Sequence, residues 1–132
     1  MNVVRLQEES YIAGIVVQGK QLGRTIGFPT ANIEVSTAAN YENGAYGVYV
    51  YYHGKRYQGV MNIGERPTFD DGIHRTYEVH ILDFNDNLYG EELTVEVMFY
   101  IRSEKKFDSL QALIQQLHAD VFYTRKQLHP LI

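Results

Sequence analysis

The strongest indication of the fold lies in residues 45–63, which read AYGVYVYYHGKRYQGVMNI. Residues 45–52 are rich in Val and Tyr, which are residue types that favour strands. His53-Gly54-Lys55 is a turn signal, and residues 57–63 then resume the β pattern. Two such runs on either side of a short turn predict a β-hairpin.

Three further stretches carry strand patterns. Tyr11–Val17 is an apolar run that suits a buried strand, and residues 93–101 form a long run of Val, Met, Phe and Tyr. In residues 76–84 apolar side chains alternate with a more polar set, which is the period of a strand with one buried face. These five strands have short connections and no helix between them, and they favour an antiparallel barrel over a doubly wound sheet.

The last part of the chain changes to a helical period, and we expect a helix over about 108–128. Asp108 is a candidate helix cap, with Gln111 as its capping-box partner. The opposite face of this helix carries Gln111, Gln115 and His118. The apolar residues expected to pack on the barrel are Leu110, Leu113, Ile114, Leu117 and Val121.

Length and composition limit the class of protein. A chain of 132 residues suits one domain, and we expect a single domain over 1–132 with the barrel at about 11–102. The net charge of −4 argues against a general nucleic-acid-binding surface. The absence of cysteine excludes disulfides, thiolate zinc sites and cysteine nucleophiles. No apolar run suits a membrane helix or a signal peptide, so we expect a cytoplasmic protein, and nothing demands more than a monomer.

Residues 14–32, which read GIVVQGKQLGRTIGFPTAN, hold the densest set of candidate functional residues. Glycines in this stretch surround Lys20 and Arg24. Glycine lets the backbone approach a ligand closely, and two cations offer charge to phosphates. The pattern is equally compatible with an ordinary glycine-rich turn, and it matches neither a Walker loop nor a dinucleotide fingerprint.

Thr30 and Asn32 lie at the end of this stretch. In an extended chain, residues two apart point to the same side, so both side-chain oxygens would face one ligand. Such oxygens suit Mg²⁺, which takes phosphates and waters as its other ligands. A Thr and an Asn more commonly satisfy a turn, and both alternatives stay open on the spacing alone.

Several separated motifs resemble the riboflavin kinase (flavokinase) family, over about residues 11–120. In particular, the chain resembles the C-terminal kinase domain of bacterial bifunctional riboflavin kinase/FMN adenylyltransferases. The motifs are the signature GRTIGFPTAN (23–32), the flap region GVMNIGERPTF (59–69), the catalytic strand and turn YEVHILDF (77–84) with LYG (88–90), and the flavin-facing loop IRSEKKFDSL (101–110).

The resemblance implies a six-stranded antiparallel Greek-key barrel with a C-terminal helix. The implied reaction transfers the γ-phosphoryl group of ATP to the 5′-hydroxyl of riboflavin, giving FMN and ADP, with Mg²⁺ as the metal ion. The implied partners are these small molecules, with no nucleic acid and no membrane. By residue, the resemblance implies Mg²⁺ and ATP contacts at Thr30 and Asn32, further ATP contacts at Gly19, Arg24, Ile81, Asp83 and Tyr89, and flavin contacts at Arg102, Lys105 and Phe107.

Glu78 is the candidate general base. Phosphoryl transfer relies on positioning, and a carboxylate can accept the proton of the substrate hydroxyl. A glutamate on an otherwise apolar strand is held on a rigid element. An outward-facing, solvated Glu is the alternative, and the motif favours the catalytic role. His80, two residues on, shares the side of Glu78 and has no assigned role.

Two other classes of function remain as alternatives. The first is a flavin-binding regulator that retains the kinase fold and acts on RNA or a protein, and the second is flavin storage or sensing. Only about ten residues precede the first expected strand, so we expect no adenylyltransferase domain and no formation of FAD.

Overall fold

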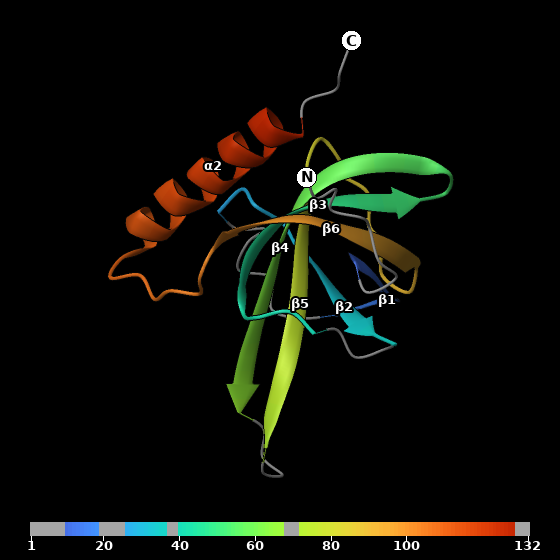
Figure 1. The fold of residues 1–132 in the computed structure, drawn as a ribbon, viewed down its shortest axis with the longest axis horizontal. Coiled ribbons are helices and arrows are strands. Elements are labelled where there is room, and N and C mark those ends of the chain that lie inside the picture. Colours follow the sequence, from blue (N-terminus) through green and yellow to red (C-terminus); the bar gives the residue numbers. More distant parts are fainter. Residues whose placement is uncertain (1–9, 19–25, 37–39, 68–71, 129–132) are drawn as a thin grey trace, which may run out of the picture.

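The computed structural model describes residues 10–18, 26–36, 40–67 and 72–128. Figure 1 shows a barrel of strands with one helix packed against its side. Within the described residues, no helix has the length and apolar character needed to cross a membrane. The elements are β1 (Tyr11–Val17), β2 (Ala31–Val35), β3 (Gly44–Tyr52), β4 (Lys55–Pro67), β5 (Ile73–Ile81), β6 (Glu92–Arg102) and α2 (Leu110–Gln127).

The six strands close into an antiparallel barrel in the order β1-β2-β5-β4-β3-β6. β6 lies beside β3 rather than β5, and β2 lies beside β5 rather than β3, so both connections follow the Greek-key rule. This architecture confirms the fold expected from the resemblance. The hydrophobic pattern alone indicated five strands, because β2 has only 5 residues and only Ile33 of them is buried.

The β3–β4 hairpin has the short turn that the sequence predicts. Tyr52 pairs with Lys55, which leaves His53 and Gly54 as a two-residue loop. Their φ angles are 50° and 78°, so both adopt the left-handed conformation that a type I′ turn requires. This turn twists in the same sense as the strands, and β3 and β4 pair along the whole length of β3.

The interior of the barrel is filled by alternate side chains from all six strands. β1 differs from the buried strand that its apolar run predicted, because Tyr11 and Ile15 point outward and are each 43% exposed. Gly14 allows β1 to approach β2 closely, since a Cβ there would lie 2.3 Å from the carbonyl oxygen of Glu34. The fully buried core residues include Ile12, Val48, Val50, Met61, Ile63, Val79, Leu93 and Val95.

The N-terminal cap of helix α2 lies one residue later than expected. The Oγ of Ser109 accepts a hydrogen bond from the backbone N–H of Ala112 at 3.0 Å. Ser109 also has the extended backbone of a cap residue, so the prediction that Asp108 caps the helix is wrong. Gln111, Gln115 and His118 are exposed as expected, and the ring of His118 also packs edge-on against Phe28.

The residues of α2 that lie deepest are polar. Asp120 is 1% exposed and Thr124 is fully buried, whereas Leu110, expected on the buried face, is 52% exposed. Other apolar residues of this face are only half-buried, because Leu113, Leu117 and Val121 border a cavity between the helix and the barrel. The periodicity of the helix had indicated a continuous apolar contact with the barrel. The structure shows instead that a cavity interrupts this contact.

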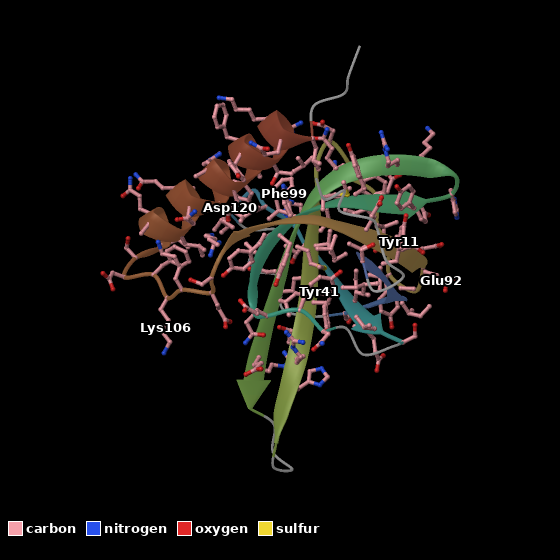
Figure 2. The ribbon with its side chains drawn as sticks, in the orientation of Figure 1. Tyr11, Tyr41, Glu92, Phe99, Lys106 and Asp120 are labelled. Atoms are coloured by element: carbon pink, nitrogen blue, oxygen red, sulfur yellow. The ribbon has the colours of Figure 1, made fainter. Side chains whose placement is uncertain are left out.

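Two Arg–Asp pairs join α2 to the rest of the fold. In the first, Arg102 of β6 donates from Nε and Nη2 to the carboxylate of Asp120, with a closest distance of 2.8 Å. Both side chains are largely withdrawn from water, and Figure 2 places Asp120 on the side of α2 that faces the strands. In the second, Arg125 donates both terminal nitrogens to Asp83 after β5, but this pair is open to solvent.

We expect the two pairs to differ strongly in their effect on stability. Asp120→Ala leaves a largely buried guanidinium without its carboxylate and should lower the free energy of unfolding by about 3–5 kcal/mol. Asp83→Ala removes a solvated pair and should cost about 0–1 kcal/mol. Urea denaturation followed by circular dichroism measures both values, and equal losses would contradict this assignment.

The pKa of Asp83 should report its pair directly. Hydrogen bonds from Arg125, and then its charge, lower the pKa of this carboxyl below its usual 3.8. The ion pair therefore contributes above the unfolded pKa, and the contribution disappears as the pH falls through the lowered value. NMR titration should show the pKa rising in Arg125→Gln. The matched variant Lys126→Gln removes a charge one residue away, and an equal rise there would contradict a specific pair.

Candidate active site

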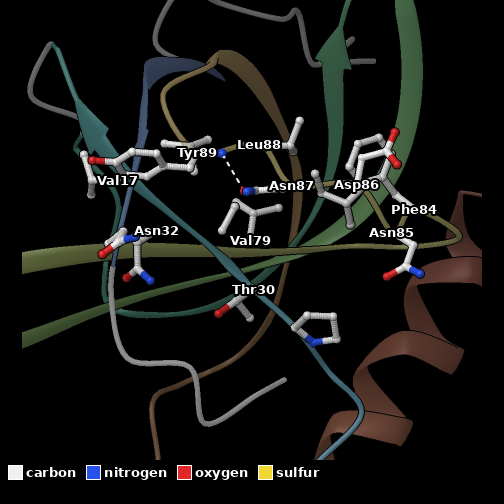
Figure 3. A pocket seen from close by; sticks show the side chains of 15 residues that line it. Val17, Thr30, Asn32, Val79, Phe84, Asn85, Asp86, Asn87, Leu88 and Tyr89 are labelled. Carbon is white, nitrogen blue, oxygen red and sulfur yellow. Dashed lines mark hydrogen bonds between the residues drawn. The ribbon is translucent and has the colours of Figure 1, made fainter. Parts of the chain in front are cut away.

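A polar pocket lies at one end of the barrel, beside the loop that joins β5 to β6. Its volume is about 580 Å³. Figure 3 shows that side chains from the end of β1, from the segment around Thr30 and from the β5–β6 loop surround it. Asn87 shapes the loop, because its Oδ1 accepts from the backbone N–H of Tyr89 at 3.0 Å. The polar side chains of the lining are Gln18, Thr30, Asn32, Asn85, Asp86, Asn87 and Tyr89.

A second pocket, of about 210 Å³, lies between the barrel and helix α2. We call it the apolar pocket, because most of its lining is aliphatic or aromatic. Carbon-rich walls with a few polar groups are typical of sites for flat organic ligands. Its apolar lining residues are Ile26, Phe28, Val60, Leu113, Leu117 and Val121, and its polar ones are Thr30, Asn62, Glu78, His80 and Asp120.

Thr30 lines both pockets and marks the place where they meet. The register of β2 against β5 places Asn32 opposite Glu78, so these two residues share one face of the sheet. The hydroxyl of Thr30 lies 3.4 Å from Oε1 of Glu78, to which it donates a long hydrogen bond. The fold thus brings Thr30, Asn32 and Glu78 together at the border of the pockets, although Thr30 and Glu78 are 48 positions apart in the chain.

Asn62 joins this group from a third strand. It pairs with Glu78 across β4 and β5, so Asn32, Glu78 and Asn62 form a row over three neighbouring strands. Sequence reasoning did not select Asn62. Asn62 lies between Met61 and Ile63 in the motif 59–69, which was the available signal, and its proximity to Glu78 depends on the strand register.

The apolar pocket contains two carboxylates in different states. Asp120 accepts hydrogen bonds from Arg102 and, at 2.9 Å, from Nε2 of Gln116, so its oxygens are occupied and its charge is balanced. Glu78 is half-buried and its hydrogen bond to Thr30 is long. Of the two, Glu78 is the carboxylate that can still accept a proton from a ligand.

The oxygens of Thr30 and Asn32 suit a hard divalent cation. Both side chains border the polar pocket, where a ligand carrying phosphates could supply further oxygens. No group of three or more His, Cys, Asp or Glu that could hold a metal ion occurs among the described residues. The donor set thus fits Mg²⁺, which takes one or two protein ligands and completes its shell with substrate phosphates and water.

The residues expected to contact a nucleotide divide into three groups. Ile81 and Tyr89 line the polar pocket together with Thr30 and Asn32. Asp83 does not belong to the described lining, and its carboxylate is paired with Arg125, which lowers its pKa. Gly19 and Arg24 lie outside the described residues.

None of the residues expected to contact a flavin belongs to the described lining of the apolar pocket. Arg102 reaches the pocket indirectly, because its guanidinium holds Asp120, which does line it. Lys105 donates to Oε1 of Gln116 on α2 at 3.4 Å. The ring of Phe107 lies 5.8 Å from the guanidinium carbon of Arg102 and 5.4 Å from the ammonium of Lys105.

Phe28 and His80 belong to the site although the sequence did not assign them to it. Phe28 is 8% exposed, and its ring meets His80 edge-on at 5.4 Å and His118 at 4.9 Å. Nδ1 of His80 lies 2.8 Å from the carbonyl oxygen of Pro29. The two-residue spacing from Glu78 was the available signal for His80, because alternate residues of a strand share a face.

The chain is similar to known proteins over most of its length. The chain is 42% identical over 116 residues to the RNA-binding riboflavin kinase RibR of Bacillus subtilis, covering 88% of this chain and 50% of that protein. It is 45% identical over 111 residues to the bifunctional riboflavin kinase/FMN adenylyltransferase of Haemophilus influenzae, covering 83% of this chain and 36% of that one. The chain therefore spans about half or less of the length of these relatives.

Two solved structures share the fold. Riboflavin kinase from Trypanosoma brucei superposes with a TM-score of 0.64 at 30% identity, over 89% of this chain and 78% of that one. A Streptococcus pneumoniae structure described as a macrolide-efflux protein superposes with a TM-score of 0.82 at 40% identity, over 87% of this chain and 38% of that one. The family model for Flavokinase, described as riboflavin kinase, matches residues 6–128. The chain belongs to the flavokinase family, as its motifs indicated.

Proposed function

We propose that this chain is a riboflavin kinase that transfers the γ-phosphoryl group of ATP to the 5′-hydroxyl of riboflavin, giving FMN and ADP. The observation that carries the proposal is the position of Thr30 in both pockets. A phosphate in the polar pocket and a hydroxyl in the apolar pocket can meet there. Membership of the flavokinase family supports ATP and riboflavin as the two substrates.

The two pockets differ in the way that the two substrates differ. Amide and carboxyl side chains of the β5–β6 loop, with the ring of Tyr89, offer hydrogen bonds and a flat face to a nucleotide. Aliphatic side chains of α2 and the ring of Phe28 offer an apolar surface to the flavin. We therefore assign ATP to the polar pocket and riboflavin to the apolar pocket.

Glu78 acts as the general base in this proposal. Its carboxylate takes the proton of the 5′-hydroxyl, the hydroxyl oxygen bonds to the γ-phosphorus, and the bond from that phosphorus to the bridging oxygen of ADP breaks. Glu78 suits this role because the other carboxylate of the pocket, Asp120, is bound by Arg102 and Gln116. The pairing of β5 with strands on both sides keeps Glu78 in place.

Thr30 and Asn32 would hold Mg²⁺ beside the phosphates. When bound, the ion neutralises the negative charge that develops on the phosphoryl group during transfer. The chain contributes the orientation of these ligands, since Asn32 is paired with Glu78 and Thr30 donates to it. The metal ligands and the base are thus parts of one connected group.

A flavin-binding regulator is the second candidate. One observation favours it, because the relative RibR is named an RNA-binding riboflavin kinase. The chain covers only half of that relative, and its net charge is −4. We therefore expect turnover without binding of nucleic acid, and the cytoplasmic location and monomeric state also stay predictions.

Replacement of Glu78 by Gln tests the base. We expect the parent chain to convert riboflavin to FMN in the presence of ATP and Mg²⁺, and Glu78→Gln to lower kcat by about 10²-fold or more. Liquid chromatography with fluorescence detection separates riboflavin, FMN and FAD. Fluorescence titration should show riboflavin binding retained in the variant.

The matched control is Glu34→Gln, the same change at an exposed position of β2. It should leave kcat unchanged. An active Glu78→Gln variant would exclude Glu78 as the base. Flavin binding by the parent without any FMN formation would instead favour the regulator or a storage role.

Replacement of Thr30 by Val tests the metal ligand, because Val keeps the shape and removes the hydroxyl. We expect the Mg²⁺ concentration for half-maximal activity to rise roughly tenfold or more, since loss of even a supporting group around a metal has effects of this size. Thr94→Val on β6 is the control and should not change it. An unchanged Mg²⁺ requirement in Thr30→Val would contradict the assignment.

A further inference from the structure

The segment that carries Thr30 is weakly held by main-chain pairing. β2 and β5 share only two registered pairs, Ala31 with Val79 and Asn32 with Glu78. The next position in this register sets Thr30 opposite His80, where no further pair is formed in the described structure. The preceding residue, Pro29, has no N–H to give to a ladder. The main-chain pairing between β2 and β5 therefore does not extend to Thr30, the residue that lines both pockets.

The side chain of Thr30 adds little restraint of its own. Thr30 is exposed, and its hydrogen bond to Glu78 measures 3.4 Å, which is long for an O–H donor. The direction of its hydroxyl thus depends on the Pro29–Thr30 peptide. Whatever holds that peptide also holds the hydroxyl at the border of the two pockets.

His80 provides this restraint where the ladder ends. Its Nδ1 lies 2.8 Å from the carbonyl oxygen of Pro29. A carbonyl oxygen only accepts hydrogen bonds, so the imidazole must carry a proton on Nδ1. Phe28 packs edge-on against the imidazole at 5.4 Å and limits its rotation. Strand β5 therefore holds both Glu78 and, through the side chain of His80, the peptide that precedes Thr30.

We propose that His80 is a positioning residue, which donates its Nδ1–H to the carbonyl oxygen of Pro29 and thereby holds the Thr30 hydroxyl between the two pockets. The role rests on the proposed kinase function, in which Thr30 is a metal ligand. His80 does not take the proton of the substrate in this scheme. It acts through the backbone of the segment that contains Thr30 and Asn32.

Two substitutions separate the hydrogen bond from the shape of the ring. His80→Leu keeps an apolar side chain of similar reach and removes the donor. His80→Asn retains an N–H near the position of Nδ1. We expect His80→Leu to lower kcat and to weaken metal binding by about 10–100-fold, the scale for groups that orient metal ligands, and His80→Asn to recover most of both losses.

Two measurements do not depend on turnover. Electron paramagnetic resonance of Mn²⁺, in the presence of ADP, should show weaker binding in His80→Leu than in the parent or His80→Asn. A long-range ¹H–¹⁵N spectrum should show the proton of His80 on Nδ1, and the amide signal of Thr30 should shift in His80→Leu. A proton found only on Nε2, or failure of Asn to restore metal binding, would overturn the proposal.

His118→Asn is the matched control, because His118 packs against the same ring of Phe28 at 4.9 Å but does not belong to the lining of either pocket. It should leave kcat and Mn²⁺ binding unchanged. If the parent turns over and His80→Leu is unimpaired, the positioning role is wrong and the kinase function stands. If the parent does not turn over, the kinase function fails, and the Mn²⁺ and NMR results still decide whether His80 holds Thr30.

Discussion

The short pairing between β2 and β5 determines where the polar groups of the site lie. It sets Asn32 opposite Glu78 and directs Thr30 to the border of two pockets. The barrel is closed and its interior is filled by apolar side chains, so the interior itself has no room for a ligand. The reactive groups can therefore lie only on the outer face or at the ends of strands, and β2 brings them to one such place.

Helix α2 forms one side of the apolar pocket, and the barrel forms the other. The ion pair between Arg102 and Asp120 holds the helix at the barrel, while Leu113 and Leu117 face a cavity. A carboxylate buried with its guanidinium partner is tolerated because several hydrogen bonds satisfy it. The same contacts remove Asp120 from proton chemistry and leave Glu78 as the available acceptor, so the stability of the helix and the chemistry of the pocket share one interaction.

Much of the fold could be predicted from local patterns. The hairpin at residues 45–63 follows from its strand-forming residues and from a turn that tolerates positive φ. β2 could not be identified in this way, since its 5 residues carry a weak pattern. Local patterns place the helix cap at Asp108, one residue too early, because Asp108 and Ser109 are both good cap residues. The hydrogen bond from the N–H of Ala112 to Ser109 decides between them.

Motif identity and local periodicity are properties of the chain, and they were enough to identify the family, the strand-rich class and the candidate residues Thr30, Asn32 and Glu78. The folded barrel was needed to show that these residues meet, that Asn62 and His80 lie beside them, and that Asp120 is neutralised by Arg102. Such proximities depend on strand order and register. These are set by closure of the barrel, which depends on contacts between residues far apart in the chain.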